Sequence, residues 1–140
     1  MSSEDAAARW REERRESAFA HAEALARRQQ AESAQARVLI AAFVARASAD
    51  GPPAVPLRAR SYDGRHRYRT SLEGWYLRRD ESVAIDREGR FYVLSTPTSM
   101  RALLRGVDPV PQDPPLVLGA GGKDGESLDL VQALDRVLAG

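Results

Sequence analysis

Hydrophobic positions follow two periods along this chain, and the change between them divides it. Residues 4–49 contain neither glycine nor proline and consist mainly of Ala, Arg, Glu and Gln, which favour a helix. Ser2 or Ser3 can cap its start, and Asp50-Gly51-Pro52-Pro53 supplies a C-terminal glycine followed by prolines that stop a helix. The pattern therefore predicts one long helix over residues 1–50.

The two parts of this helix differ in hydrophobicity. Residues 38–44 are apolar on almost every side, so we expect residues 35–50 to dock in the core of the fold. Residues 1–35 are mostly charged or alanine, with an interrupted heptad seam. We predict that this part either projects as a solvated helix or associates with a second copy or a partner. The residues assigned to its contact face are Ala18, Ala22 and Leu25.

Beyond the helix, residues 51–140 switch to a period of two and are expected to form a small domain. Residues 57–62 and 65–70 alternate on either side of Asp63-Gly64, a strong hairpin signal. Short apolar runs separated by polar turns continue through residues 74–94 and complete an antiparallel meander of about five strands. The side chains predicted to share its core face are Trp75, Leu77, Val83, Ile85, Phe91 and Val93.

Three further elements are predicted to close this domain. Residues 98–105 favour a short helix, residues 116–118 a strand, and Ser127 is placed to cap a final amphipathic helix. The fold class expected from these elements is α+β. The side chains of the short helix that are predicted to point inward are Met100, Leu103 and Leu104.

Composition narrows the possible functions. The net charge is +1 and the chain has no cysteine, which excludes disulfides, thiolate catalysis and cysteine-ligated metals. The charged N-terminus lacks the apolar segment of a secretory signal and no run is long enough to span a membrane, so we expect a cytoplasmic protein. Twenty of the 21 basic residues are arginine, which is typical of a GC-rich bacterial genome.

The glycine-rich loop 119–125 lies between a predicted strand and a predicted helix, where anions can bind. Its spacing does not match a phosphate-binding P-loop, and Asp124 and Glu126 would repel phosphate. Elsewhere the chain has only two histidines, His21 and His66, which are too far apart to form a metal pair. We therefore expect no cofactor and no metal, and an enzyme is less favoured than a binding protein.

Residues 51–80 carry seven arginines and three acidic residues, with tyrosines interleaved among them. Arg58 and Arg60 belong to this basic cluster. A basic face with aromatic residues can contact an acidic protein or bind nucleic acid. The residues predicted to contact a partner are Arg65, Arg67, Arg69, Tyr76 and Arg78.

The function predicted from these patterns is a non-catalytic binding or adaptor protein. Its long helix would serve assembly, and its basic-aromatic sheet face would contact a protein partner. Two alternatives remain open at this point. One is nucleic-acid binding through the arginine-rich hairpin 57–79, and the other is a small-ligand or enzymatic site at the loop 119–125.

Overall fold

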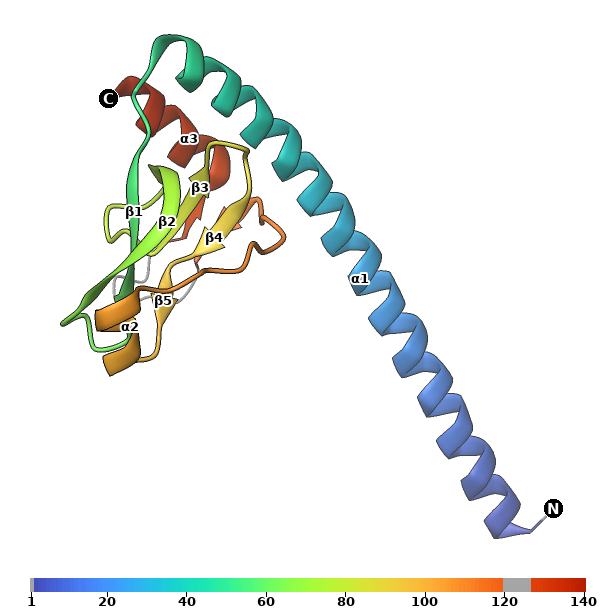
Figure 1. Cartoon of the computed structure of the whole chain (residues 1–140). Helices are drawn as coiled ribbons and strands as arrows, with labels where there is room; N and C mark the ends of the chain where they lie inside the picture. Colours follow the sequence, from blue (N-terminus) through green and yellow to red (C-terminus); the bar gives the residue numbers. More distant parts are fainter. Residues whose placement is uncertain (1, 120–126) are drawn as a thin grey trace. The chain divides into compact units, whose positions relative to one another are not determined.

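The computed structural model describes residues 2–119 and 127–140 (Figure 1). The chain separates into two compact units, Met1–Glu32 and Ser33–Gly140. Helix α1 (Ser3–Asp50) contributes to both, and it ends as predicted where Gly51 adopts a φ of 82°. Within the first unit nearly every side chain of the helix is exposed, including Trp10, whose ring lies 4.8 Å from the Arg14 guanidinium.

In its described residues, the second unit contains a five-stranded sheet, a two-stranded sheet and two further helices, which confirms the α+β class. The strand order is β4-β3-β2-β1-β5, and β5 runs parallel to β1. The sheet is therefore mixed, whereas a purely antiparallel meander was expected. Its strands are β1 (Val55–Ser61), β2 (Arg67–Tyr76), β3 (Val83–Asp86), β4 (Phe91–Val93) and β5 (Ser95–Thr96). The remaining elements are α2 (Met100–Arg105), β6 (Val117–Leu118), β7 (Leu128–Asp129) and α3 (Leu130–Ala139).

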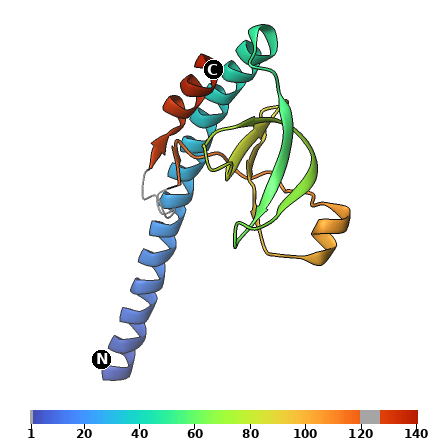
Figure 2. The same ribbon diagram turned by 90° about the vertical axis from the view of Figure 1, so that its left-hand side faces the viewer.

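The sheet curls back on itself (Figure 2). Strands β4 and β5 stand at opposite ends of the strand order, yet Leu94 alone separates them in the chain. The N–H of Leu94 donates to the carbonyl of Ser82 at 2.8 Å, and its carbonyl accepts from the N–H of Arg60 at 2.7 Å. The sheet therefore has an inner face and an outer face.

The inner face forms its own apolar core. Leu57, Tyr92 and Leu94 are almost fully buried there, and Tyr76 packs against them. At one end, Ala102 of α2 packs against Ala59 and Tyr68. The prediction that α2 turns its larger residues inward is wrong, because this six-residue helix buries only Ala102. The side chains that it leaves exposed are Met100, Leu103 and Leu104.

Part of the outer face is covered by helices. The rings of Trp75 and Phe43 meet edge to face at 5.3 Å between centroids, and Leu134 of α3 joins the same core. Although residues 38–44 are apolar on almost every side, they are not all buried, since Val38 is 70% exposed. Only one stripe of α1 is buried, and its members are Ser33, Ala36, Ile40, Phe43 and Ala47.

Strand β2 joins two segments that were predicted to be separate strands. The link, residues 71–74, stays extended, and Gly74 pairs with both Val55 and Asp86. A Cβ at Gly74 would lie 1.9 Å from the Ile85 carbonyl oxygen, so only glycine permits this close approach of β3.

Two smaller predictions also differ from the structure. Val93 lies at the end of an edge strand and is 39% exposed, although the alternation placed it in the core. Helix α3 is capped by Asp129 and not by Ser127, and the Asp129 N–H donates to the Gln132 side chain at 3.3 Å.

Within the described residues, no helix is both long and apolar enough to cross a membrane.

Candidate functional site

Four arginines face one another across the β1–β2 hairpin. In the strand register Arg58 lies opposite Arg69, and Arg60 lies opposite Arg67. Residues directly opposite in an antiparallel pair share one side of the sheet, with Cβ atoms about 5 Å apart. Here that side is the outer face, because Leu57 and Ala59, which alternate with the β1 arginines, are buried. We call this set, Arg58, Arg60, Arg67 and Arg69, the arginine face.

Like charges that are directly opposite in a sheet destabilise it. The arginine face contains two such pairs of opposed like charges, side by side. A contribution to the stability of the fold therefore does not explain why arginine occupies all four positions. Among the contacts of the described residues, one ion pair reaches it, between Arg67 Nη2 and Glu81 Oε1 at 2.8 Å. Arg69 donates to the carbonyl of Leu104 at 3.1 Å, and no carboxylate of the described residues pairs with its charge.

The side chain of Arg60 is half-buried, and its Nε is fully buried. No described residue accepts a hydrogen bond from this Nε. A buried donor without a partner costs free energy, and such groups are uncommon in native structures. The arginine face therefore combines excess positive charge with one desolvated, unsatisfied donor.

Glu81 lies in the turn between β2 and β3 and has a φ of 61°, in the left-handed region. Its neighbourhood includes the Tyr76 hydroxyl, which accepts a hydrogen bond from the Arg58 N–H at 2.8 Å. Burial raises the pKa of Tyr76, and the negative charge of Glu81 adds to that shift, whereas the positive charge of Arg67 opposes it. Glu81, Tyr76 and Arg67 thus form one electrostatic neighbourhood beside the arginine face.

The five residues predicted to contact a partner are not all on this face. Arg67 and Arg69 belong to it, and Arg65 is exposed in the preceding turn. Tyr76 packs with the inner core. The Arg78 side chain is only 14% exposed, because it donates to the Leu118 carbonyl at 3.3 Å and lies 3.6 Å from Asp80.

The contact set predicted from the sequence omitted Arg58 and Arg60. A signal for them existed in the mirrored Arg-x-Arg spacings on either side of the Asp63-Gly64 turn. Hairpin register brings such mirrored pairs together, but the register depends on the length of the turn, which alternation alone does not specify.

The aromatic side chains of the hairpin mostly point away from the arginines. Tyr68 is buried against Ala59 and Ala102, with the His66 ring stacked on it at 6.2 Å between centroids. Tyr62, in the turn, is 71% exposed. The predicted basic-aromatic face is therefore a basic face whose strand tyrosines lie on the opposite side of the sheet.

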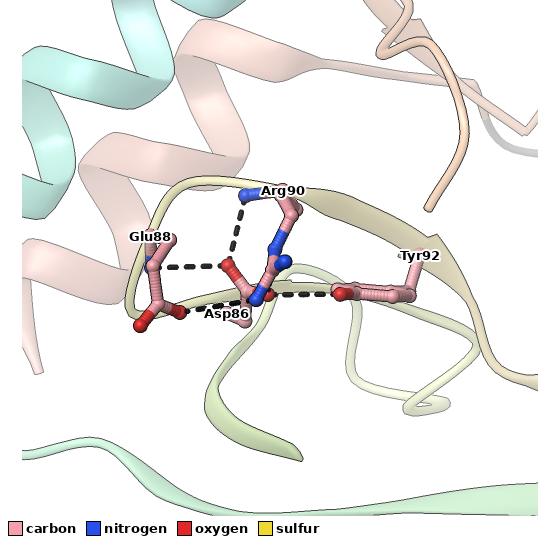
Figure 3. Close-up of polar contacts among 4 residues, drawn as sticks. All are labelled: Asp86, Glu88, Arg90 and Tyr92. Carbon is pink, nitrogen blue, oxygen red and sulfur yellow. Dashed lines mark hydrogen bonds and ion pairs between the residues drawn. The ribbon is translucent and has the colours of Figure 1, made fainter. Parts of the chain in front are cut away.

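A second polar cluster surrounds the buried carboxylate of Asp86 (Figure 3). Its Oδ1 accepts from the N–H groups of Glu88 and Arg90 at 3.0 and 2.9 Å. Its Oδ2 accepts from Arg90 Nε at 2.8 Å and from the Tyr92 hydroxyl at 2.9 Å. Burial, together with this hydrogen bond, raises the pKa of Tyr92 to about 12. A carboxylate has about four acceptor sites, and these are all used, so the cluster holds the β3–β4 turn in place.

A cleft with a volume of about 340 Å³ lies between α1, the β3–β4 turn and residues 111–114. The two arginines on it, Arg37 and Arg90, already form ion pairs with Asp113 and Asp86. In the described part of the chain, no group of three or more His, Cys, Asp or Glu side chains could hold a metal ion. The cleft therefore offers a ligand little unpaired charge.

Two further sites were predicted, one at the loop 119–125 and one on the N-terminal part of the helix. Of the loop 119–125, residues 120–125 lie outside the described residues. In the first unit, the three residues assigned to an assembly face are all exposed on the helix, and Leu25 is 45% exposed. Their role in association stays a prediction. These three residues are Ala18, Ala22 and Leu25.

Comparison with known proteins found no matching family model, no matching curated protein and no matching solved structure.

Proposed function

We propose that this chain is a non-catalytic binding protein whose arginine face docks an acidic segment of a partner protein. The observation that carries the proposal is the register of the β1–β2 hairpin, which opposes Arg58 to Arg69 and Arg60 to Arg67. Within the described residues Glu81 is the carboxylate paired with this face, so an acidic partner would relieve repulsion that the fold leaves in place.

The position of the aromatic residues favours a protein partner over single-stranded nucleic acid. Binding of single strands combines phosphate contacts with bases stacked on exposed aromatic rings. Here Tyr68 and Tyr76 pack on the inner side of the sheet, and Trp75 is buried under α1. Tyr62 alone, in the hairpin turn, would offer a ring beside the arginines among the described residues.

The long helix enters the proposal as an assembly element. Ala18, Ala22 and Leu25 are exposed in the first unit, which supports a contact with a second copy. Light scattering of the full chain and of Leu25→Glu tests this part. We expect a mass above that of a monomer that falls in the variant, and a monomer in both samples would contradict it. Cytoplasmic location and bacterial origin stay predictions from the sequence.

Fluorescence anisotropy with a labelled glutamate-rich peptide tests the docking surface. We expect binding that weakens as salt approaches about 0.15 M, because exposed charges are screened there. The double variant Arg58→Ser/Arg69→Ser should lose about tenfold in affinity, or about 1.4 kcal/mol. Arg101→Ser, an exposed arginine on α2, is the matched control and should retain wild-type affinity.

Two outcomes would overturn the proposal. One is an equal loss of affinity in the Arg101 control, which would show that net charge and not the arginine face governs binding. The other is tighter binding of single-stranded RNA than of the acidic peptide, which would favour the nucleic-acid function instead.

A further inference from the structure

The Arg60–Arg67 pair is the part of the arginine face that combines an ion pair to a carboxylate with a buried, unsatisfied donor. The two residues are directly opposite in the register. Glu81 contacts Arg67 through a single carboxylate oxygen, at 2.8 Å from Nη2. Arg60, on the neighbouring strand β1, has a buried Nε for which no described residue provides an acceptor. Within the described residues, the Glu81 carboxylate therefore pairs with Arg67, and the opposing guanidinium of Arg60 has no carboxylate partner.

Backbone hydrogen bonds link the turn that carries Glu81 to the strand that carries Arg60. Ser82, the next residue, accepts through its carbonyl from the Leu94 N–H, and the Leu94 carbonyl accepts from the Arg60 N–H. The turn that carries Glu81 is therefore joined to β1 through Leu94. An anion bound to Arg60 and Arg67 would compete with the Glu81 carboxylate for the Arg67 guanidinium.

The chemistry of the pair fits a doubly charged oxyanion better than a carboxylate. A phosphoryl group on serine, threonine or tyrosine carries about −1.5 to −2 charges near neutral pH and has three strong acceptor oxygens. It can accept from two guanidinium groups at once, and charge-assisted bonds of this kind are roughly twice as strong as neutral ones. Arginine clusters that bind phosphorylated or acidic motifs are a recurring mode of peptide recognition.

We propose that Arg60 and Arg67 together bind a phosphoryl group on the partner's acidic segment, and that Glu81 is the intramolecular carboxylate which this group displaces. The inference rests on the proposed function, and it specifies the partner as a phosphorylated protein segment.

Displacement of the Glu81 carboxylate requires only its side chain to move, because the backbone of the turn is held by other contacts. The position of Glu81 is set by the backbone, since the Glu81 N–H donates to the Arg78 carbonyl at 3.1 Å. Both the N–H and the hydroxyl of Ser82 donate to Asp80, at 3.0 and 2.6 Å. The Glu81 side chain, by contrast, is held through its contacts with Arg67 and the Tyr76 neighbourhood. A rotamer change would release Arg67 while the turn stays in place.

Titration calorimetry with the full chain and three synthetic peptides tests the proposal. The peptides share one glutamate-rich sequence and differ at one position, which is phosphoserine, serine or glutamate. We expect the phosphoserine peptide to bind about tenfold more tightly than the serine peptide, as one additional charge-assisted contact predicts. The glutamate peptide should lie between them.

Two variants should shift this preference in opposite directions. Arg60→Lys keeps the charge but loses the planar fork of donors, so the advantage of phosphoserine should fall to about twofold or less. Glu81→Gln removes the competing carboxylate, so the affinity for the phosphoserine peptide should rise by about threefold. Arg101→Lys is the control and should change neither value. Circular dichroism of each variant establishes that it is folded.

The outcomes separate this inference from the proposed function. Equal binding of the phosphoserine and serine peptides, still lost in Arg58→Ser/Arg69→Ser, would overturn the phosphoryl site and leave the acidic docking surface intact. If no peptide binds, both proposals are wrong. If single-stranded RNA displaces the phosphoserine peptide and binds more tightly in an Arg60-dependent way, the pair recognises nucleic-acid phosphates, and the protein partner is wrong.

Discussion

Strand β2 presents two different surfaces on one face along its length. Trp75, near its end, is 4% exposed beneath α1, whereas Arg67 and Arg69, near its start, are exposed to solvent. All three side chains point to the outer face, because they are separated by even numbers of residues along the strand. The difference is that helices cover one part of the outer face and not the other, so alternation assigns a side chain to a face without deciding whether that face is core.

The two hairpin turns at these two parts show the same contrast. Each is organised by an aspartate that accepts hydrogen bonds from its own turn. Asp86, in the helix-covered part, is buried and accepts four hydrogen bonds. Asp63, in the arginine part, is exposed and accepts from the Ser61 hydroxyl and the Arg65 N–H. Related turn chemistry thus stabilises a core in one place and a surface hairpin in the other.

The largest expected effect comes from truncating the covered surface. Trp75→Ala should lower the free energy of unfolding by about 3–5 kcal/mol, because it removes the edge-to-face contact with Phe43 and leaves a cavity. Arg67→Ala, on the same face of the same strand, should change it by about 0.5 kcal/mol or less. Urea unfolding measures both, and equal losses would show that the two parts of β2 do not differ in burial as described.

The second effect compares the two aspartates. Asp86→Ala should cost about 3 kcal/mol, because it leaves the buried Tyr92 hydroxyl and two part-buried N–H groups without this acceptor. Asp63→Ala should cost clearly less, since water can replace the carboxylate at its exposed turn. Thermal unfolding of both variants is the measurement, and a larger loss for Asp63→Ala would contradict the contrast.

The third effect is a loss of folding stability at alkaline pH. The folded chain raises the pKa of Tyr92 to about 12 from its ordinary value of 10, so the folded state holds this proton more tightly than the unfolded state. The stabilisation is complete below pH 10 and is lost as the pH rises through 12. Denaturant unfolding at increasing pH should show this loss in the wild type and in Tyr62→Phe, an exposed control. In Tyr92→Phe the loss should be much smaller, and an unchanged alkaline profile would contradict the assignment.

The smallest effect concerns the arginine part. Arg58→Thr should raise the free energy of unfolding by a few tenths of a kcal/mol, because it removes one like-charged pair from the hairpin. The gain should shrink at high salt, where repulsion is screened. Arg101→Thr is the control, because Arg101 lies on helix α2 and is not part of the strand pairs. A stability loss in Arg58→Thr that exceeds the control would show that the face stabilises the fold.

Part of the candidate site could be predicted from the sequence. The Asp63-Gly64 turn and the alternating arginines around it predicted a basic hairpin, and Arg67 and Arg69 lie on its exposed face. Tyr76 and Arg78 were assigned to the same surface by adjacency. In the structure Tyr76 packs against the inner core of the curled sheet. The Arg78 side chain instead donates a hydrogen bond to the Leu118 carbonyl, so neither residue belongs to the arginine face.

The sequence by itself determined the elements of this protein. Residues without glycine or proline form α1, the Gly51 region ends it, and a period of two defines the strands, because these are local preferences of the backbone and of side-chain direction. Only the tertiary structure decided which surfaces face solvent. The parallel β1–β5 pair curls the sheet, α1 and α3 cover one part of its outer face, and the strand register places four arginines opposite one another on the other part. Those outcomes depend on contacts between residues far apart in the chain, which no local pattern specifies.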